Sequence, residues 1–191
     1  EVSYVTPSCV TKVRGELGKK LAEICPGDLN KAFFTLCGAT SIENAIKLAR
    51  LYTGRHKILS RYQSYHGASI GAISASGDPR RIPADAQQAP NFVHFDLPYL
   101  YRWEYGEENL LKESVAQLER MIAYEGPGNI AAILLEGESG SSGCLQYPVG
   151  YLKAVRELCN KHGILLIMDE VMSGFGRTGK WFAVEHWNVV P

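Results

Sequence analysis

The sequence lacks the features that mark several large classes of protein. Its 20 Lys and Arg residues balance 20 Asp and Glu residues over 191 positions, so no net charge favours binding to nucleic acid or to anionic lipid. No apolar run approaches the roughly 20 residues that a membrane-spanning helix requires. The first residues show neither a secretory signal pattern nor an Arg-rich presequence. We therefore expect a cytoplasmic protein with no nucleic-acid or membrane partner.

Cysteine is also sparse. The five cysteines are odd in number and show no CxxC spacing, which favours neither a zinc site nor a disulfide framework; they are Cys9, Cys25, Cys37, Cys144 and Cys159. We expect reduced thiols and no bound metal, while a disulfide between one pair stays open. The sequence shows no internal repeat, low-complexity tract or interdomain linker.

What the sequence does show is an alternation of apolar strands with amphipathic helices. We expect strands at residues 32–36, 57–60, 92–95, 130–135 and 164–168. We expect helices at residues 10–25, 41–52, 108–124 and 149–162, and a short one starting within residues 66–74. Such alternation predicts a single α/β domain with a mostly parallel sheet and helices on both faces, a three-layer αβα arrangement.

The most informative segment is GILLIMDEVMSGFGRTGK, residues 163–180. Its apolar strand ends in Asp169 and Glu170, and the carboxyl ends of strands in open α/β sheets are where ligands bind. Because a buried aspartate needs a partner, we expect a cationic group opposite Asp169. Such an acid suits a Mg²⁺-nucleotide site or a pyridoxal phosphate site. The nucleotide alternative is weakened by Trp181, which stands where a phosphate loop needs Ser or Thr.

Two further turns follow expected strands. In FFTLCGATS, Gly38 allows a close backbone approach, and the start of the next helix could bind phosphate, although a plain capping turn with Thr40 or Ser41 as N-cap is the commoner case. In RYQSYHGAS, Tyr65 could stack on a planar ring or simply be a core residue. His66 is more often a structural histidine than an acid or base.

Together these segments resemble the class III (ω-amino acid type) aminotransferases of pyridoxal phosphate fold type I. The resemblance covers essentially the whole chain, through CGATSIENAIKLARLYTG, SYHGASIGAISASG, IAAILLEGESGSSG, YLKAVRELCNKHGILLIMDEV and SGFGRTGKWFAVEHW in family order. DEV followed by SGFGRTGK is the most specific of these blocks.

The resemblance implies pyridoxal 5'-phosphate as cofactor and assigns roles to residues of this chain. The cofactor-binding set would be Gly38, Ala39, Thr40, Tyr65, His66, Glu136, Asp169, Val171 and Met172. Backbone amides of the 38–39 turn would hold the phosphate. Tyr65 and Val171 would cover the two faces of the pyridine ring, and Asp169 would pair with its nitrogen. Glu136 would orient its neighbours from behind the ring.

Other positions depart from the family pattern. Ala39 and Thr40 stand where many members have Ser or Thr followed by Glu, and Met172 stands where many have Gln. Ser141 replaces a Glu that members acting on 4-aminobutyrate often carry. These departures favour the branch that resembles taurine–pyruvate, β-alanine–pyruvate or ω-amine–pyruvate aminotransferases. Arg102 could bind a substrate carboxylate, although a surface arginine is the commoner case.

In the family, the catalytic lysine that forms the Schiff base lies well downstream of GFGRTG, and no lysine here matches it. Lys180 matches a family lysine with another role, and Lys153 and Lys161 lie on a polar helix face. Residues 1–191 are therefore expected to be the central part of the large cofactor-binding domain, inactive alone, from an enzyme that moves an amino group from an amine or ω-amino acid to pyruvate or another 2-oxo acid. Family active sites lie at a subunit interface, which implies a homodimer. The alternative is a non-catalytic cofactor-binding or structural relative that ends here naturally.

Overall fold

A computed structural model of the chain describes residues 4–6, 8–102 and 106–191. The chain divides into two compact units, Glu1–Phe34 and Thr35–Pro191. The described part of the first unit contains helix α1, Lys12–Ile24. Thr11 caps this helix, because its hydroxyl accepts a hydrogen bond from the backbone N–H of Arg14 at 3.3 Å. No residue of α1 is buried.

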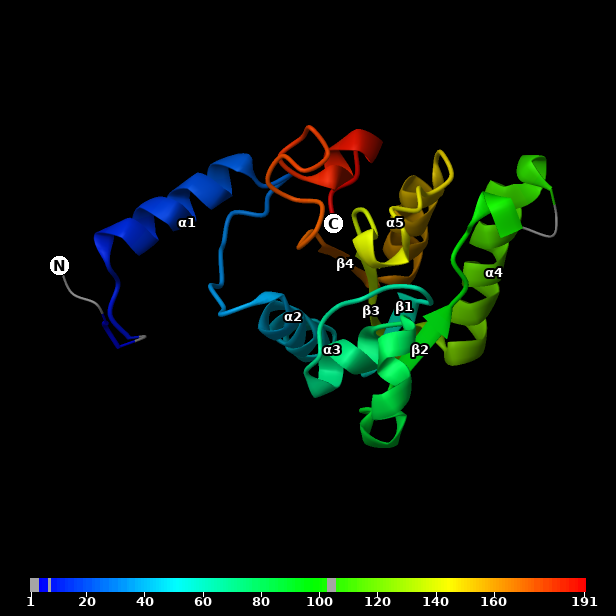
Figure 1. Cartoon of the computed structure of the whole chain (residues 1–191), viewed down its shortest axis with the longest axis horizontal. Helices are drawn as coiled ribbons and strands as arrows, with labels where there is room; N and C mark the ends of the chain where they lie inside the picture. The colour runs from blue at the N-terminus through cyan, green and yellow to red at the C-terminus, as the bar shows by residue number, and fades with distance from the viewer. Residues whose placement is uncertain (1–3, 7, 103–105) are drawn as a thin grey trace. The chain divides into compact units, whose positions relative to one another are not determined.

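The second unit is built on a four-stranded sheet with the order β2-β1-β3-β4 (Figure 1). The strands are β1, Lys57–Arg61, β2, Phe92–Phe95, β3, Ile130–Glu136, and β4, Leu165–Asp169. All three strand pairs are parallel. The predicted α/β class and parallel sheet are therefore confirmed, with strand boundaries within one residue of those expected.

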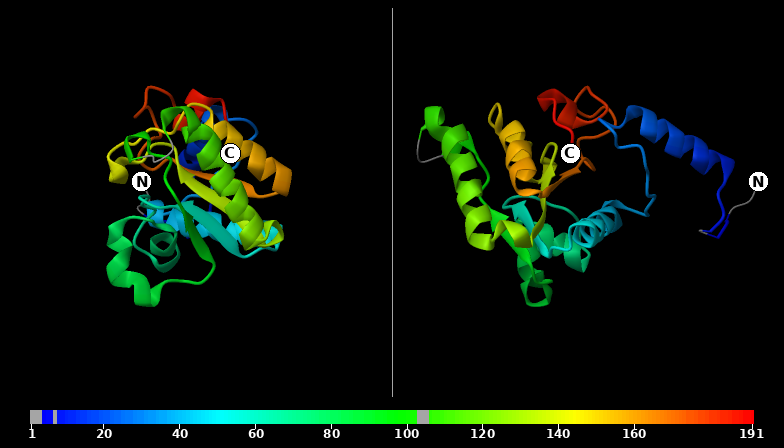
Figure 2. Two further views of the ribbon diagram at one scale, coloured as in Figure 1. Left: turned by 90° about the vertical axis from the view of Figure 1, so that its right-hand side faces the viewer. Right: turned by 180° about the vertical axis from the view of Figure 1, so that it is seen from behind.

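Helices cover both faces of this sheet, as the left view of Figure 2 shows. Helices α2, Gly38–Thr53, and α3, Ile70–Ala75, pack on one face, and α4, Leu110–Glu125, and α5, Tyr151–His162, pack on the other. Short 3₁₀ helices lie in the connections: η1 Pro79–Gln87, η2 Leu100–Arg102, η3 Glu107–Asn109, η4 Pro127–Asn129, η5 Gly140–Ser142 and η6 Ala183–Trp187. The predicted αβα layering is confirmed.

Strand β3 holds the two layers together. All seven of its residues are buried, as expected for a parallel strand covered on both faces. Ile133 and Leu135 belong to the core beneath α4 and α5, whereas Ala132 and Leu134 belong to the core beneath α2 and α3. Side chains that alternate along one strand thus fill two separate cores.

The amino-terminal edge of the sheet is held by Arg55. Its Nη1 atom lies 3.1 Å from the carbonyl oxygen of Ile130, 3.1 Å from that of His162 and 2.8 Å from that of Gly163. These oxygens belong to the start of β3 and to the end of α5. One guanidinium therefore joins a strand and a helix that are more than 70 residues further along the chain.

Two details of the sequence prediction are wrong. The expected strand at residues 32–36 is absent, and Leu36 is 96% exposed; a short apolar run cannot be identified as a strand from its pattern alone. Helix α2 begins at Gly38 with Cys37 as N-cap, not at Ser41 with Thr40 or Ser41 as N-cap. Thr40 instead donates its hydroxyl to the Cys37 carbonyl at 2.9 Å.

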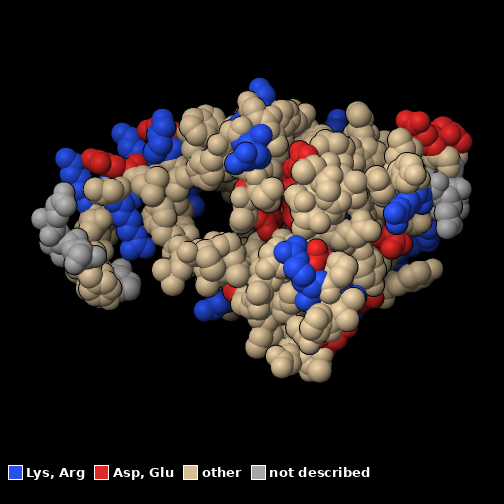
Figure 3. All heavy atoms as spheres, viewed as in Figure 1, with Lys and Arg blue, Asp and Glu red and all other residues tan. Residues whose placement is uncertain are grey.

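The surface carries charges of both signs, and the cysteines form no disulfide. Basic and acidic side chains are interspersed on the face drawn in Figure 3. No helix among the described residues has the length and hydropathy needed to cross a bilayer. All five cysteines are free, and Cys159 is buried, which raises the pKa of its thiol to about 11.

Candidate functional site

Two carboxylates lie side by side at the carboxyl edge of the sheet. The register of β3 and β4 pairs Glu136 with Asp169, the last residue of each strand. Both are buried, with 5% and 6% of their surface exposed. The backbone N–H of Gly137 donates to the carbonyl oxygen of Asp169 at 3.0 Å, which fixes the two strand ends to each other. Neither acid could stay buried without a partner.

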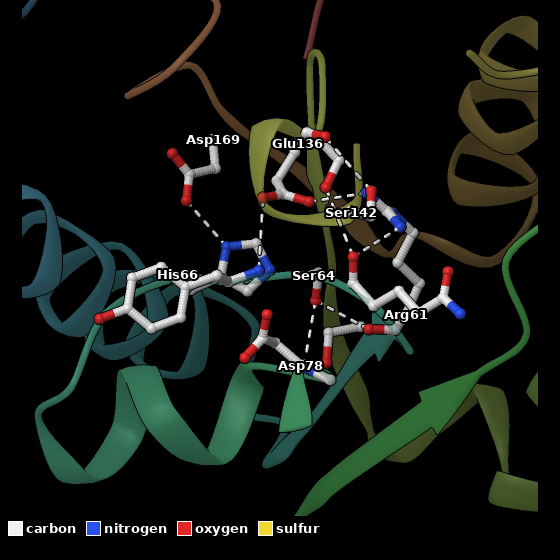
Figure 4. A network of polar contacts seen from close by, with 12 residues as sticks. Arg61, Ser64, His66, Asp78, Glu136, Ser142 and Asp169 are labelled. Atoms are coloured by element: carbon white, nitrogen blue, oxygen red, sulfur yellow. Dashed lines mark hydrogen bonds and ion pairs between the residues drawn. The ribbon is translucent and has the colours of Figure 1, made fainter. Parts of the chain in front are cut away.

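The partner of Asp169 is His66, as Figure 4 shows. The Oδ2 atom of Asp169 lies 2.8 Å from Nδ1 of the buried imidazole. Its Oδ1 atom accepts a hydrogen bond from the backbone N–H of Val171 at 3.0 Å. Each carboxylate oxygen therefore has one fixed contact, so the orientation of the group is set by the protein. The expected partner opposite Asp169 is a histidine rather than an arginine or lysine.

The cation of the site lies opposite Glu136 instead. Arg61 ends β1, and its fully buried guanidinium donates from Nη2 to Glu136 Oε2 at 2.7 Å. Its Nε donates to the Tyr147 hydroxyl at 3.0 Å, and its Nη1 donates to the carbonyl oxygens of Tyr62 and Gln63 at 3.2 and 3.1 Å. All three nitrogens of the buried cation are therefore hydrogen-bonded, as a buried ion pair requires.

Glu136 also holds the turn that follows β1. Its second oxygen, Oε1, accepts a hydrogen bond from the backbone N–H of Tyr65 at 3.3 Å. Glu136 thus contacts both Arg61 and the backbone of Tyr65, while its role behind a cofactor ring stays a prediction. Through Arg61 and Tyr65, one carboxylate connects the ends of β1 and β3.

The predicted turn at residues 38–39 lies against the same edge. A Cβ atom added to Gly38 would stand 3.0 Å from Cγ2 of Val171, so the valine side chain packs directly on this glycine. A Cβ added to Gly67 would stand 2.6 Å from the Cβ of Ala39. Close packing at Gly38 and Gly67 thus brings the start of α2, the Tyr65 turn and the end of β4 together.

The start of α2 stabilises negative charge. The exposed thiol of Cys37 has its pKa lowered, chiefly by hydrogen bonds from the backbone and side chain of Thr40 and to a smaller extent from the backbone of Ala39. Desolvation acts in the opposite direction on this pKa, but the hydrogen bonds from Thr40 outweigh it. Amides at a helix N-terminus that favour a thiolate are suited to other anions as well.

The remaining predicted residues are placed as follows. Val171 and Met172 are exposed apolar residues at the end of β4, with 70% and 54% of their surface accessible. Arg102 lies in η2, and no hydrogen bond or ion pair joins it to Asp169 or Glu136 within the described ranges. Ser141 lies in η5 and brings no charge to the position where some family members carry a glutamate. A cavity of about 540 Å³ opens beside Met172 and is lined also by Glu138, Gly140, Cys144, Gln146, Arg177, Thr178, His186 and Trp187.

The second acid of the Asp-Glu pair is structural. Glu170 accepts a hydrogen bond from the Ser173 hydroxyl. It also accepts one from the backbone N–H of Ala183 and one from that of Val184, each at 3.0 Å. The carboxylate therefore fastens η6 to the end of β4. Both of its oxygens therefore hold neighbouring parts of the chain.

The glycine-rich loop does not form a phosphate cradle. Three of its backbone N–H groups donate to backbone carbonyl oxygens: Gly174 to Glu170 at 2.8 Å, Phe175 to Trp181 at 2.6 Å and Gly176 to Lys180 at 3.0 Å. A phosphate loop needs such amides free to face the ligand. The nucleotide alternative therefore loses its phosphate loop.

Several residues of this site were not singled out in the sequence. Tyr147 and Arg61 contact Glu136 from 11 and 75 positions away, and Arg80 stacks on Tyr65 from 15 positions away. No local spacing reveals such pairs. Arg61 did carry one signal: it is an arginine that directly follows the expected strand at residues 57–60. A charge in that position needs a buried partner.

The fold and the site define an α/β cofactor-binding domain whose ligand edge combines a buried acid, an aromatic turn and a helix N-terminus. The chain belongs to the class-III aminotransferases, whose family model matches residues 2–191.

Solved structures and curated proteins agree with this family. The taurine:2-oxoglutarate aminotransferase of Bifidobacterium kashiwanohense, solved in complex with PLP and glutamate, is 44% identical with a TM-score of 0.93, over 98% of this chain and 44% of that one. The (S)-enantioselective omega-transaminase of Thermomicrobium roseum is 41% identical with a TM-score of 0.91, over 95% and 42%. The acetylornithine aminotransferase of Methanopyrus kandleri is 39% identical over 93% of this chain and 41% of its own. The chain spans less than half the length of these relatives.

Proposed function

We propose that this chain is the cofactor-holding part of an enzyme that transfers an amino group from an amine or ω-amino acid to pyruvate or another 2-oxo acid, with pyridoxal phosphate as cofactor. The observation that carries the proposal is the Asp169 carboxylate, buried at the carboxyl edge and held by His66 and by the backbone of Val171, whose side chain packs on Gly38. Family membership and the PLP complex of the related taurine aminotransferase support it.

The residues of this edge fit such a group. Asp169 would hold the pyridine nitrogen, because a carboxylate at that point keeps the nitrogen protonated. The His66 contact prevents the carboxylate from rotating away. Tyr65 and the exposed Val171 supply apolar surfaces for the two faces of a flat ring. The amides at the start of α2, which already favour a thiolate at Cys37, would hold the phosphate.

Bound pyridoxal phosphate supplies an electron sink for the carbanion left when a substrate loses its Cα proton. The residues of this chain orient and hold that group. We propose that the catalytic lysine comes from elsewhere in the protein and that this chain alone does not transaminate. In support, Lys57 pairs with Glu125 at 2.6 Å at the amino end of β1, and Lys161 pairs with Glu119 at 2.6 Å. We also propose a cytoplasmic homodimer with its active site at the subunit interface.

An ω-amino donor of the taurine or β-alanine type is the finer part of the proposal. It is supported by the uncharged Ser141 in η5, by Met172 at the end of β4, and by the 44% identity to a taurine aminotransferase. Arg102 stays a candidate for the substrate carboxylate.

The test uses the protein that contains this chain. Taurine, β-alanine, putrescine and 4-aminobutyrate are supplied in turn with pyruvate or 2-oxoglutarate, and alanine or glutamate is measured by chromatography. We expect transfer from taurine or β-alanine. Asp169→Asn is expected to weaken pyridoxal phosphate binding about 10- to 100-fold, the equivalent of one lost charged hydrogen bond, while Asp85→Asn on the exposed η1 leaves binding unchanged.

Two results would contradict different parts of the proposal. Tight cofactor binding without amino transfer from any donor would make the protein a non-catalytic relative. Unchanged cofactor binding in Asp169→Asn would show that the site is assigned to the wrong carboxylate.

A further inference from the structure

An arginine covers one face of the Tyr65 ring. The guanidinium carbon of Arg80 stands 3.6 Å from the ring centroid, which is direct face-on stacking. No aromatic ring in the described part of the chain stacks on Tyr65. The ring thus has one face under a flat cation and its opposite face free of any such contact.

Arg80 is held in that position by Asp78. Its Nε donates to Asp78 Oδ1 at 2.7 Å and its Nη2 donates to Asp78 Oδ2 at 3.0 Å, a two-pronged contact that fixes the plane of the guanidinium. The backbone N–H of Arg80 also donates to Asp78 Oδ1 at 2.8 Å. The Arg80 side chain is 54% exposed, whereas that of Asp78 is only 11% exposed. The buried Asp78 carboxylate therefore sets the orientation of the more exposed Arg80 guanidinium.

The support for Asp78 comes from the turn that carries Tyr65. The backbone N–H groups of Gly77 and Asp78 both donate to the carbonyl oxygen of Ser64 at 3.0 Å. Gly77 packs so tightly that an added Cβ would stand 2.2 Å from the carbonyl oxygen of Arg61. The arginine and the tyrosine that it covers are thus fixed to one rigid piece of backbone.

We propose that Arg80, directed by Asp78, is a positioning residue that fixes the Tyr65 ring so that only its opposite face can stack on the pyridine ring of pyridoxal phosphate. This inference rests on the proposed function. The backbone of Tyr65 is fixed by Glu136, but a hydrogen bond to the backbone leaves the χ angles of the ring free. The stacked guanidinium, itself fixed in plane, restricts those angles and reduces the rotamer entropy lost on binding.

The test measures binding of pyridoxal phosphate to the cofactor-free protein by equilibrium dialysis, together with visible circular dichroism of the bound cofactor. Arg80→Ala is expected to weaken binding about two- to fivefold and to reduce the dichroism. Arg80→Lys is expected to resemble Arg80→Ala, because an ammonium lacks the planar fork. Arg81→Ala is the matched control: the adjacent arginine pairs with Asp85 and lies 5.8 Å from the Tyr62 ring. It should bind the cofactor as the wild type does.

A double-mutant cycle with Tyr65→Leu decides whether Arg80 acts through the tyrosine. In the Tyr65→Leu background, Arg80→Ala is expected to cause no further loss of binding. A full additional loss there would overturn the inference, as would wild-type binding and dichroism in Arg80→Ala. If the wild type itself does not bind pyridoxal phosphate, the proposed function fails; if it binds and only the Arg80 effect is missing, this inference alone fails.

Discussion

Replacing Glu136 with glutamine is expected to destabilise the protein strongly, because the change leaves a buried cation without its counter-charge. The Arg61 guanidinium is fully buried and lies 2.7 Å from the Glu136 carboxylate. Removing one member of a buried ion pair costs about 3–5 kcal/mol. We expect the lower end, about 3 kcal/mol, since three neutral oxygens would still accept hydrogen bonds from Arg61.

The size of the effect makes it easy to measure. Folded domains are stable by only about 5–15 kcal/mol, so 3 kcal/mol is a large share. With a urea m-value of about 2 kcal/mol/M, the unfolding midpoint should fall by about 1.5 M. Urea titration of the whole chain, followed by circular dichroism, measures this shift.

Glu138→Gln provides the matched control, two residues further along. Glu138 accepts a hydrogen bond from the exposed Gln146 side chain at 2.7 Å, and a glutamine oxygen can replace it. The unfolding free energy of the Glu138→Gln variant should stay within about 0.5 kcal/mol of that of the wild type. If Glu136→Gln and Glu138→Gln unfold at the same urea concentration, the Arg61–Glu136 pair does not stabilise the fold as argued.

Three other changes test separate features. Gly77→Ala should destabilise the fold or prevent folding, because the new methyl group would clash with strand-end backbone at 2.2 Å; a urea midpoint equal to that of the wild type would refute this. Iodoacetamide should label Cys37 well before Cys159 at neutral pH, since the Cys37 pKa is lowered and that of Cys159 is about 11, and peptide mass spectrometry reports the order; bound cofactor should slow labelling of Cys37. Burial lowers the pKa of His94 below 6.5, so the unfolded state binds the extra proton and stability should fall as pH drops from about 6.5. His94→Gln should weaken that pH dependence in urea titrations at pH 7.5 and 5.5, and an unchanged slope would count against it.

The sequence predicted the layout of the edge better than its contacts. Strands at the expected places put Glu136 and Asp169 at neighbouring strand ends, because parallel strands present their carboxyl ends together. The short strand β2 was also predicted at its observed residues. Hydrophobic periodicity and turn residues indicate the positions of strands from local sequence alone, and the folded chain keeps those positions.

Pairing between distant residues could not be predicted in the same way. The sequence shows that Asp169 needs a partner but not that His66 supplies it, and the buried arginine of this edge, Arg61, pairs with Glu136 instead. Which carboxylate pairs with which basic side chain depends on the distances between side chains across the sheet edge. Spacing along the chain does not give those distances. The expected strand before α2 failed because no described strand pairs with residues 32–36.

Arg55 has a consequence for how this fold can change. It locks strand β3 and helix α5 at the edge farthest from the carboxylates, through carbonyl oxygens that any residue would offer. One anchor of the sheet is thereby placed at the rim opposite the ligand chemistry. Substitutions among the residues that would touch a ligand leave this Arg55 contact intact.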